Sequence, residues 1–186
     1  MSEEKVLTKE IAEQFIADED SVDLYEFTKD LYEFTKLDDD AAEILSTSNV
    51  DDLALDGLAS LSDAAAESLS RMNLESLSLD GLTSLSDAAA ESLSKMKLDY
   101  LSLSYLTSLS DAAAKSLFCI EAELISLDAL TSLSDAAAES LSRSKSEISI
   151  DGITSLSDTA AKSLAKKDPD KLSLPDELEE QVARFR

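Results

Sequence analysis

Leucines recur along this chain in short alternating segments, each followed by a run of small and polar residues. Near the middle of the chain, Leu77 and Leu79 alternate with Ser78, which predicts a short strand with one apolar side. Leu82 and Leu85 follow at spacings of three, so they stay on the same core while the chain turns away from the strand. The pattern therefore predicts a strand followed by a turn, with the apolar side chains of both facing one core.

The segment after the turn has the features of a short helix. Ser86 is a favourable N-cap residue, and Asp87 places negative charge beside the positive end of the helix dipole. Three alanines follow, which are strong helix formers, and Leu93 returns an apolar side chain to the core. Each unit is thus predicted to contain one strand and one helix.

This unit repeats along the chain. The sequence LSDAAAESLS occurs three times, and two degenerate copies begin at Leu109 and Leu156. The predicted strands begin 24, 24, 24, 23 and 24 residues apart, at Leu53, Leu77, Leu101, Ile125, Ile148 and Leu172. Such a period is typical of a solenoid, in which each unit buries its apolar side against its neighbours. Because helices are wider than strands, we expect parallel strands on the concave face and short helices on the convex face of an α/β fold.

The apolar pattern from Leu74 to Leu85 resembles the leading half of a leucine-rich repeat, and SDAAAESLS resembles the helical half. The likeness is to the bacterial 24-residue type, similar to ribonuclease-inhibitor-like and GALA-type repeats, and it covers Val22–Leu174. Most such repeats carry Asn or Cys at the ninth position, where this chain has Leu or Ile. The resemblance implies a leucine-rich repeat solenoid that binds proteins on its concave face.

The chain is predicted to be a single solenoid domain, 1–186, with repeats over 22–174. Residues 1–21 are expected to contain an N-terminal cap helix, because Leu7–Phe15 aligns with the helical half of the repeat. Larger side chains in this segment suit a helix that covers the exposed end of the core.

Residues 175–186 are expected to form a C-terminal cap helix. Asp176 is the predicted N-cap of this helix. The side chains expected to face the core are Leu178, Val182 and Phe185.

One repeat is seven residues too long, because DLYEFTK occurs twice in tandem at 23–36. Either Val22 and Leu24 fill the core positions of the strand, or Lys29 and Leu31 do. Burial of valine rather than lysine favours the first register. We therefore expect a strand at Val22–Leu24, with the surplus residues looping out before Leu37. Apolar residues at heptad spacing leave open an extra helix in the doubled segment, and the origin of the duplication, natural or engineered, stays open.

Composition narrows the possible partners. The formal net charge of −24 disfavours nucleic acid and anionic membranes and favours basic partners, although it also serves solubility. No segment has the length of apolar sequence that a membrane span needs. The N-terminal sequence lacks the features of a signal peptide, and a single cysteine suits a reducing compartment. We therefore expect a cytoplasmic protein, with an oligomeric state that the sequence leaves open.

Composition also limits the chemistry. The chain has no histidine and one cysteine, so it lacks histidine-based catalytic triads, histidine-containing zinc sites and thiolate clusters. Its three glycines follow the repeat period and form no phosphate-binding loop. We expect neither an enzyme nor a bound cofactor or metal.

Candidate binding residues are found where the exposed ladders of the predicted strands change character. Tyr100 and Tyr105 replace small residues in one repeat, and Leu124 lies next to Tyr100 in the following one. Aromatic side chains at the centre of a surface are typical interface anchors. Asp80 and Asp128 belong to an acidic ladder that could bind a cation or a basic peptide.

A second departure lies on the helical side, where Phe118 and Cys119 replace Ser94 and Lys95 and are expected to expose an apolar spot.

Together these features favour a non-enzymatic scaffold for proteins or peptides, with basic partners favoured by the negative charge. A repeat protein of structural, orphan or engineered origin, without a specific partner, is the competing interpretation.

Overall fold

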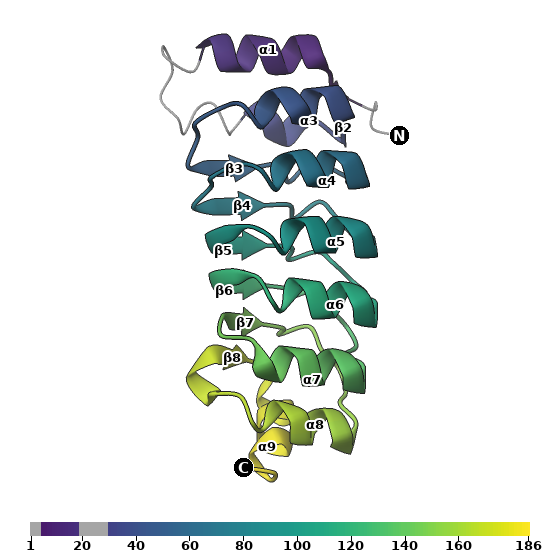
Figure 1. The fold of residues 1–186 in the computed structure, drawn as a ribbon. Helices are drawn as coiled ribbons and strands as arrows, with labels where there is room; N and C mark the ends of the chain where they lie inside the picture. The colour runs from purple at the N-terminus through teal and green to yellow at the C-terminus, as the bar shows by residue number, and fades with distance from the viewer. Residues whose placement is uncertain (1–4, 19–29) are drawn as a thin grey trace.

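The computed structural model describes residues 5–18 and 30–186. Its main body is an α/β repeat solenoid, with a six-stranded parallel sheet on one side and a column of helices on the other (Figure 1). In the sheet the strands lie in chain order, β3-β4-β5-β6-β7-β8. We call the outward side of this sheet the strand face. None of the described helices is long and apolar enough to cross a membrane.

The elements follow the predicted alternation. The strands are β1 (Val6–Leu7), β2 (Lys36–Leu37), β3 (Asp52–Ala54), β4 (Ser76–Ser78), β5 (Lys97–Ser102), β6 (Glu121–Ser126), β7 (Glu147–Ser149) and β8 (Leu172–Ser173). The α-helices are α1 (Lys9–Asp18), α3 (Asp39–Leu45), α4 (Asp63–Leu69), α5 (Asp87–Leu93), α6 (Asp111–Leu117), α7 (Asp135–Arg143), α8 (Asp158–Leu164) and α9 (Asp176–Ala183). Two 3-10 helices, η1 (Asp30–Glu33) and η2 (Pro169–Lys171), complete the described part.

The strand register confirms the predicted period. The six predicted strand residues are aligned from strand to strand as Leu53, Leu77, Leu101, Ile125, Ile148 and Leu172. All six side chains are buried, and they form one side of a continuous core. The strands β5 and β6 begin earlier than the repeat pattern predicts, because Lys97 and Leu98 pair with Glu121 and Ala122.

Serine residues cap the helices, as predicted for Ser86. The hydroxyl oxygen of Ser86 accepts a hydrogen bond from the backbone N–H of Ala89 at 3.0 Å. The same hydroxyl donates to the carboxylate of Asp63, which begins the preceding helix. This two-sided bond recurs at Ser62, Ser110, Ser134 and Ser157. Each cap therefore ties its helix to the previous repeat.

The turn after each strand is closed by the backbone. The N–H of Leu82 donates to the carbonyl of Leu79 at 3.1 Å, and the N–H of Leu79 donates to Ser102 of the next strand at 2.9 Å. Corresponding bonds close the turns at Leu58, Leu106, Leu130 and Ile153. The ninth position can therefore hold a buried aliphatic side chain in place of Asn or Cys.

The described part of the duplicated segment corrects the expected register. Leu31 is fully buried, and it lies 24 residues before Leu55, the core residue of the next repeat. A Cβ on Gly57 would meet the backbone carbonyls of Tyr32 and Phe34, as one on Gly81 would meet those of Asp56 and Leu58. The second copy therefore fills the regular repeat, and Leu31 takes the place that we expected for Leu24. The predicted strand at Val22–Leu24 lies outside the described residues.

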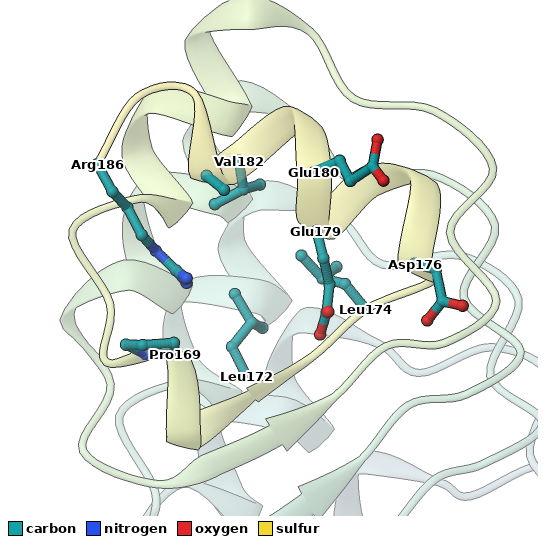
Figure 2. A pocket seen from close by; sticks show the side chains of 9 residues that line it. Pro169, Leu172, Leu174, Asp176, Glu179, Glu180, Val182 and Arg186 are labelled. Carbon is teal, nitrogen blue, oxygen red and sulfur yellow. The ribbon is translucent and has the colours of Figure 1, made fainter.

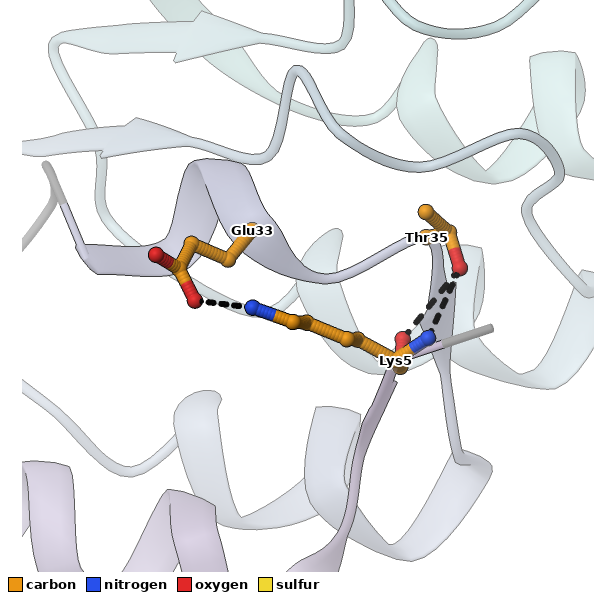
Figure 3. Close-up of polar contacts among 3 residues, drawn as sticks. All are labelled: Lys5, Glu33 and Thr35. Atoms are coloured by element: carbon orange, nitrogen blue, oxygen red, sulfur yellow. Dashed lines mark hydrogen bonds and ion pairs between the residues drawn. The ribbon is translucent and has the colours of Figure 1, made fainter. Parts of the chain in front are cut away.

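The second copy also anchors the N-terminal strand. The backbone carbonyl of Lys5 accepts bonds from the N–H groups of Thr35 at 2.9 Å and Lys36 at 3.2 Å. The Lys5 ammonium pairs with Glu33, which lowers the pKa of that carboxyl through the hydrogen bond and the nearby positive charge (Figure 3). The expected register rested on the burial of valine rather than lysine and did not include these contacts between Lys5 and the second copy.

The C-terminal helix differs from the prediction in two residues. The N-cap of α9 is Pro175, and Asp176 lies in the first turn without acting as a cap. Val182 is buried as expected, whereas Phe185 is 36% exposed and the Lys162 ammonium lies 5.2 Å from its ring centre. A hollow of about 470 Å³ separates α9 from β8, and Arg186 reaches back toward it (Figure 2).

Candidate interaction surfaces

The strand face carries an aromatic and aliphatic pair near its centre. Tyr100 on β5 and Leu124 on β6 are direct partners in the strand register, and both are partly exposed. Their neighbours in the same row are Ser76 on one side and Glu147 on the other. Two of the three predicted anchor residues are thus brought side by side.

The third anchor residue, Tyr105, lies in the turn that follows β5 and is 65% exposed. It occupies the position that Gly81 holds in the preceding repeat. We call Tyr100, Tyr105 and Leu124 the anchor patch. Its residues offer two phenol groups and one aliphatic side chain to solvent.

The predicted acidic ladder is part of the internal hydrogen bonding. The Asp80 carboxylate accepts bonds from the Ser102 hydroxyl and, at 2.7 Å, from the backbone N–H of Ser104. Asp128 accepts bonds from the hydroxyls of Ser126 at 2.7 Å and Ser149. Each carboxylate therefore holds the turn of its own or the next repeat, and Asp128 also remains exposed to solvent.

Serines between these aspartates complete a continuous polar chain. The Ser104 hydroxyl lies 2.9 Å from the hydroxyls of both Ser102 and Ser126. Ser102 is 1% exposed and Ser126 is 5% exposed, so these two hydroxyls already have their partners inside the protein. A ligand on this face would contact the anchor patch and the outer aspartate oxygens, because the serine floor is already hydrogen-bonded.

A second surface appears along the loops that lead from each helix to the next strand, which we call the helix-to-strand edge. Between residues 51 and 175, every basic residue lies between the last turn of a helix and the start of the following strand. They are Arg71, Lys95, Lys97, Lys115, Arg143, Lys145, Lys162, Lys166, Lys167 and Lys171. The opposite ends of these helices begin with aspartate. Sequence reasoning missed this segregation, although the position of each basic residue within the period carried the signal.

A groove of about 830 Å³ opens in this edge beside α6 and the starts of β5 and β6. Phe118 and Cys119 both line it, but the expected exposed apolar spot is wrong for Phe118, which is 2% exposed. Phe118 is the C-cap residue of α6 and turns into the core, whereas Cys119 is exposed. We expected Phe118 to be exposed because of its position on the helical side, but the chain changes direction at this helix end and the side chain packs into the core.

One substitution and one shortened repeat lie beside the hollow. Ala122 pairs with Leu98 in the strand register and is smaller than the leucines that precede it at this position, Leu74 and Leu98. The following repeat is one residue shorter, and the polar residue Ser146 lies in its loop, where its hydroxyl donates to the carbonyl of Ile120 at 3.3 Å. The groove therefore marks a place where the repeat loses apolar volume.

Charged groups on the groove differ between its two walls. On the strand side, the Lys97 ammonium lies 2.9 Å from the Glu121 carboxylate. This hydrogen bond lowers the pKa of Glu121, and the charges of Lys97 and then Lys145 lower it further. On the helix side, Arg143 pairs with Glu139.

Metal and family comparisons add no identification. Over residues 5–18 and 30–186, no group of three or more Asp, Glu, Cys or His side chains is arranged to hold a metal ion. No family model matches the chain, and neither a curated protein nor a solved structure matches it.

Proposed function

We propose that the chain is a non-enzymatic scaffold that binds a protein or peptide on the strand face, through the anchor patch. The observation that carries this proposal is the register of Tyr100 with Leu124. Two large side chains lie side by side and partly exposed in the middle of the sheet, where the next positions in the same row are Ser76 and Glu147. Large anchors at the centre of a surface contribute most of the binding energy in typical interfaces.

The surrounding charge favours a basic partner. Asp128 is exposed in the turn after β6, one repeat beyond Tyr105, and Asp151 is exposed in the turn after β7. The whole chain has a formal net charge of −24. A basic segment would be attracted before contact and would then dock its apolar side chains on Tyr100 and Leu124. The resemblance to bacterial leucine-rich repeats and the lone exposed Cys119 support a place among those proteins and in a reducing cytoplasm.

A pull-down tests the proposal. The wild-type chain and the double variant Tyr100→Ala/Tyr105→Ala are immobilised at equal density and exposed to the same extract at physiological salt. We expect specific proteins to be retained by the wild type and lost from the double variant. Tyr32→Ala is the matched control, since Tyr32 is a 48% exposed tyrosine at the N-terminal end.

The outcome separates the two functions that the sequence left open. Retention that depends on the anchor patch and survives Tyr32→Ala supports the scaffold. Identical retention by all three chains contradicts it and favours a repeat protein without a specific partner on this face.

A further inference from the structure

We propose that the groove in the helix-to-strand edge binds a small anionic amphiphile, with an alkyl body against its apolar floor and a carboxylate on Lys115 and Lys145. This site is separate from the anchor patch, and neither Tyr100 nor Tyr105 lines it. The groove would bind an anionic ligand, whereas the strand face is proposed to bind a basic partner.

The floor of the groove suits an alkyl chain. Phe118, Ile120 and Ala122 line it in sequence order, from the end of α6 to the start of β6. Phe118 and Ile120 are buried beneath the floor, and Ala122 is the partly exposed residue of the three. The volume of about 830 Å³ lies within the range of small-molecule sites, which are mostly apolar with a few polar groups. The small side chain of Ala122 keeps this space open, where a leucine stands in the two preceding repeats.

The charge of the groove departs from that of the molecule. Four of the sixteen basic residues of the chain line it, although the chain has forty acidic residues. Lys97 and Arg143 are engaged in ion pairs, whereas Lys115 and Lys145 have no carboxylate within ion-pair distance in the described part of the chain. These two ammonium groups are available to an anionic headgroup.

The positions of the acidic residues determine the orientation in which the ligand binds in the groove. Glu75 immediately precedes β4, Asp99 lies in β5, and Glu121 and Glu123 lie in β6. Lys115 comes from α6, and Lys145 comes from the loop between α7 and β7, where its charge also lowers the pKa of Glu121. A ligand carboxylate is repelled by these four acidic groups and attracted to the ammonium groups of Lys115 and Lys145. The alkyl body then lies over the floor between the two walls.

Cys119 provides a direct reporter, because it is the only cysteine in the chain and is exposed at the groove. The experiment measures the rate of Cys119 alkylation by neutral iodoacetamide, with dodecanoate added below its micelle concentration. We expect about a tenfold slower reaction when dodecanoate is at about ten times its dissociation constant. Dodecyltrimethylammonium is the matched cationic probe. Because the chain has a net charge of −24, nonspecific binding would favour this cation over dodecanoate.

Two variants test the two halves of the site. Ala122→Leu fills the floor, and Lys115→Met/Lys145→Met removes the headgroup cations. Both are expected to lose the protection of Cys119 by dodecanoate while keeping their circular dichroism spectra. Lys95→Met/Lys166→Met has the same change in net charge outside the groove and is expected to keep the protection.

Each other result contradicts the proposal. Equal or stronger protection by dodecyltrimethylammonium shows general adsorption of alkyl chains. If dodecanoate does not protect Cys119 in the wild type, the groove does not bind it. Protection that survives Lys115→Met/Lys145→Met shows that the lysines do not hold the headgroup.

Discussion

The ammonium group of Lys167 lies 2.8 Å from the backbone carbonyl oxygen of Ser146, in the preceding repeat. It also donates to the carbonyl of Ser144 at 3.0 Å, and the residue is only 4% exposed. By count along the repeats, Lys167 stands at the position held by Met96 and Ile120. A charged side chain therefore occupies an apolar position, and its hydrogen bonds hold the polar loop of the short repeat.

Lys167→Met is expected to raise the free energy of unfolding at neutral pH by about 1 kcal/mol, because methionine suits the position and a buried ammonium is costly. The two carbonyls lose a donor, which limits the gain. Lys166→Met, at the exposed neighbouring residue, is the control and should leave the melting temperature nearly unchanged. A clear loss of stability in Lys167→Met would show that the two hydrogen bonds outweigh the burial of charge.

The same lysine predicts a dependence on pH. Burial lowers the pKa of Lys167 from its ordinary value of 10.5, and the nearby charge of Lys171 lowers it further. Between the folded pKa and 10.5 the unfolded chain binds more protons, so this group makes the fold more stable as pH rises. The difference in unfolding free energy between Lys167→Met and the wild type should therefore shrink over that interval. Urea titrations at several pH values measure it, and a difference that is constant with pH contradicts the prediction.

The bonds between successive helices predict an energetic coupling between repeats. Ser110→Ala removes both the cap bond to Ala113 and the bond to Asp87, and it is expected to cost about 1 kcal/mol. Ser108→Ala is the control, at an exposed serine of the same segment.

A double-mutant cycle with Asp87→Ala isolates the bond between the repeats. The sum of the losses in unfolding free energy of the two single variants should exceed the loss in the double variant by about 0.5 kcal/mol or more, because the two residues share one hydrogen bond. Strict additivity would show that the link contributes nothing measurable to stability.

The exposed pair of Lys97 and Glu121 predicts a local effect on titration. The pKa of Glu121 is lowered from 4.5 by its hydrogen bond to Lys97, so the pair stabilises the fold above that pH and the contribution is lost as pH falls through the folded pKa. Lys97→Met should return the pKa of Glu121 toward 4.5 in a carboxyl-detected NMR titration. Because both groups are exposed, the melting temperature should change little. An unchanged Glu121 pKa in Lys97→Met contradicts the assigned cause.

Shortening the duplicated segment by seven residues should preserve the fold with equal or higher stability. The two DLYEFTK copies are identical, so deletion of either one yields the same polypeptide. After the deletion Val22 lies 24 residues before Leu53, as Lys29 does in the full chain. The retained copy supplies the buried leucine and the contacts with Lys5. A deletion of seven residues within a regular repeat, 83–89, is the control and should unfold the chain. Circular dichroism and thermal melting decide, and a large loss of stability in the first deletion is the contradicting result.

The period of the sequence sufficed to place the strands and helices, because residues such as Leu77 and Leu101 recur at one spacing and bury the same side of each unit. It also placed Tyr100 beside Leu124. It failed where contacts between distant segments decide. Phe118 turns inward at a helix end, and Leu31 fills the core position that the sequence pattern had assigned to the first copy of the duplicated segment.

The hydrogen bonds that join successive strands run along the length of the stack, from Leu79 to Ser102 and from Leu103 to Ser126. A force applied to the two ends of the chain is therefore carried by the repeats in series, and it separates one repeat from the next without having to shear the whole sheet at once. Each detached unit frees 24 residues, or about 80 Å of extended chain. Under tension the protein should lengthen in steps of that size, at forces set by the contacts between two neighbouring repeats.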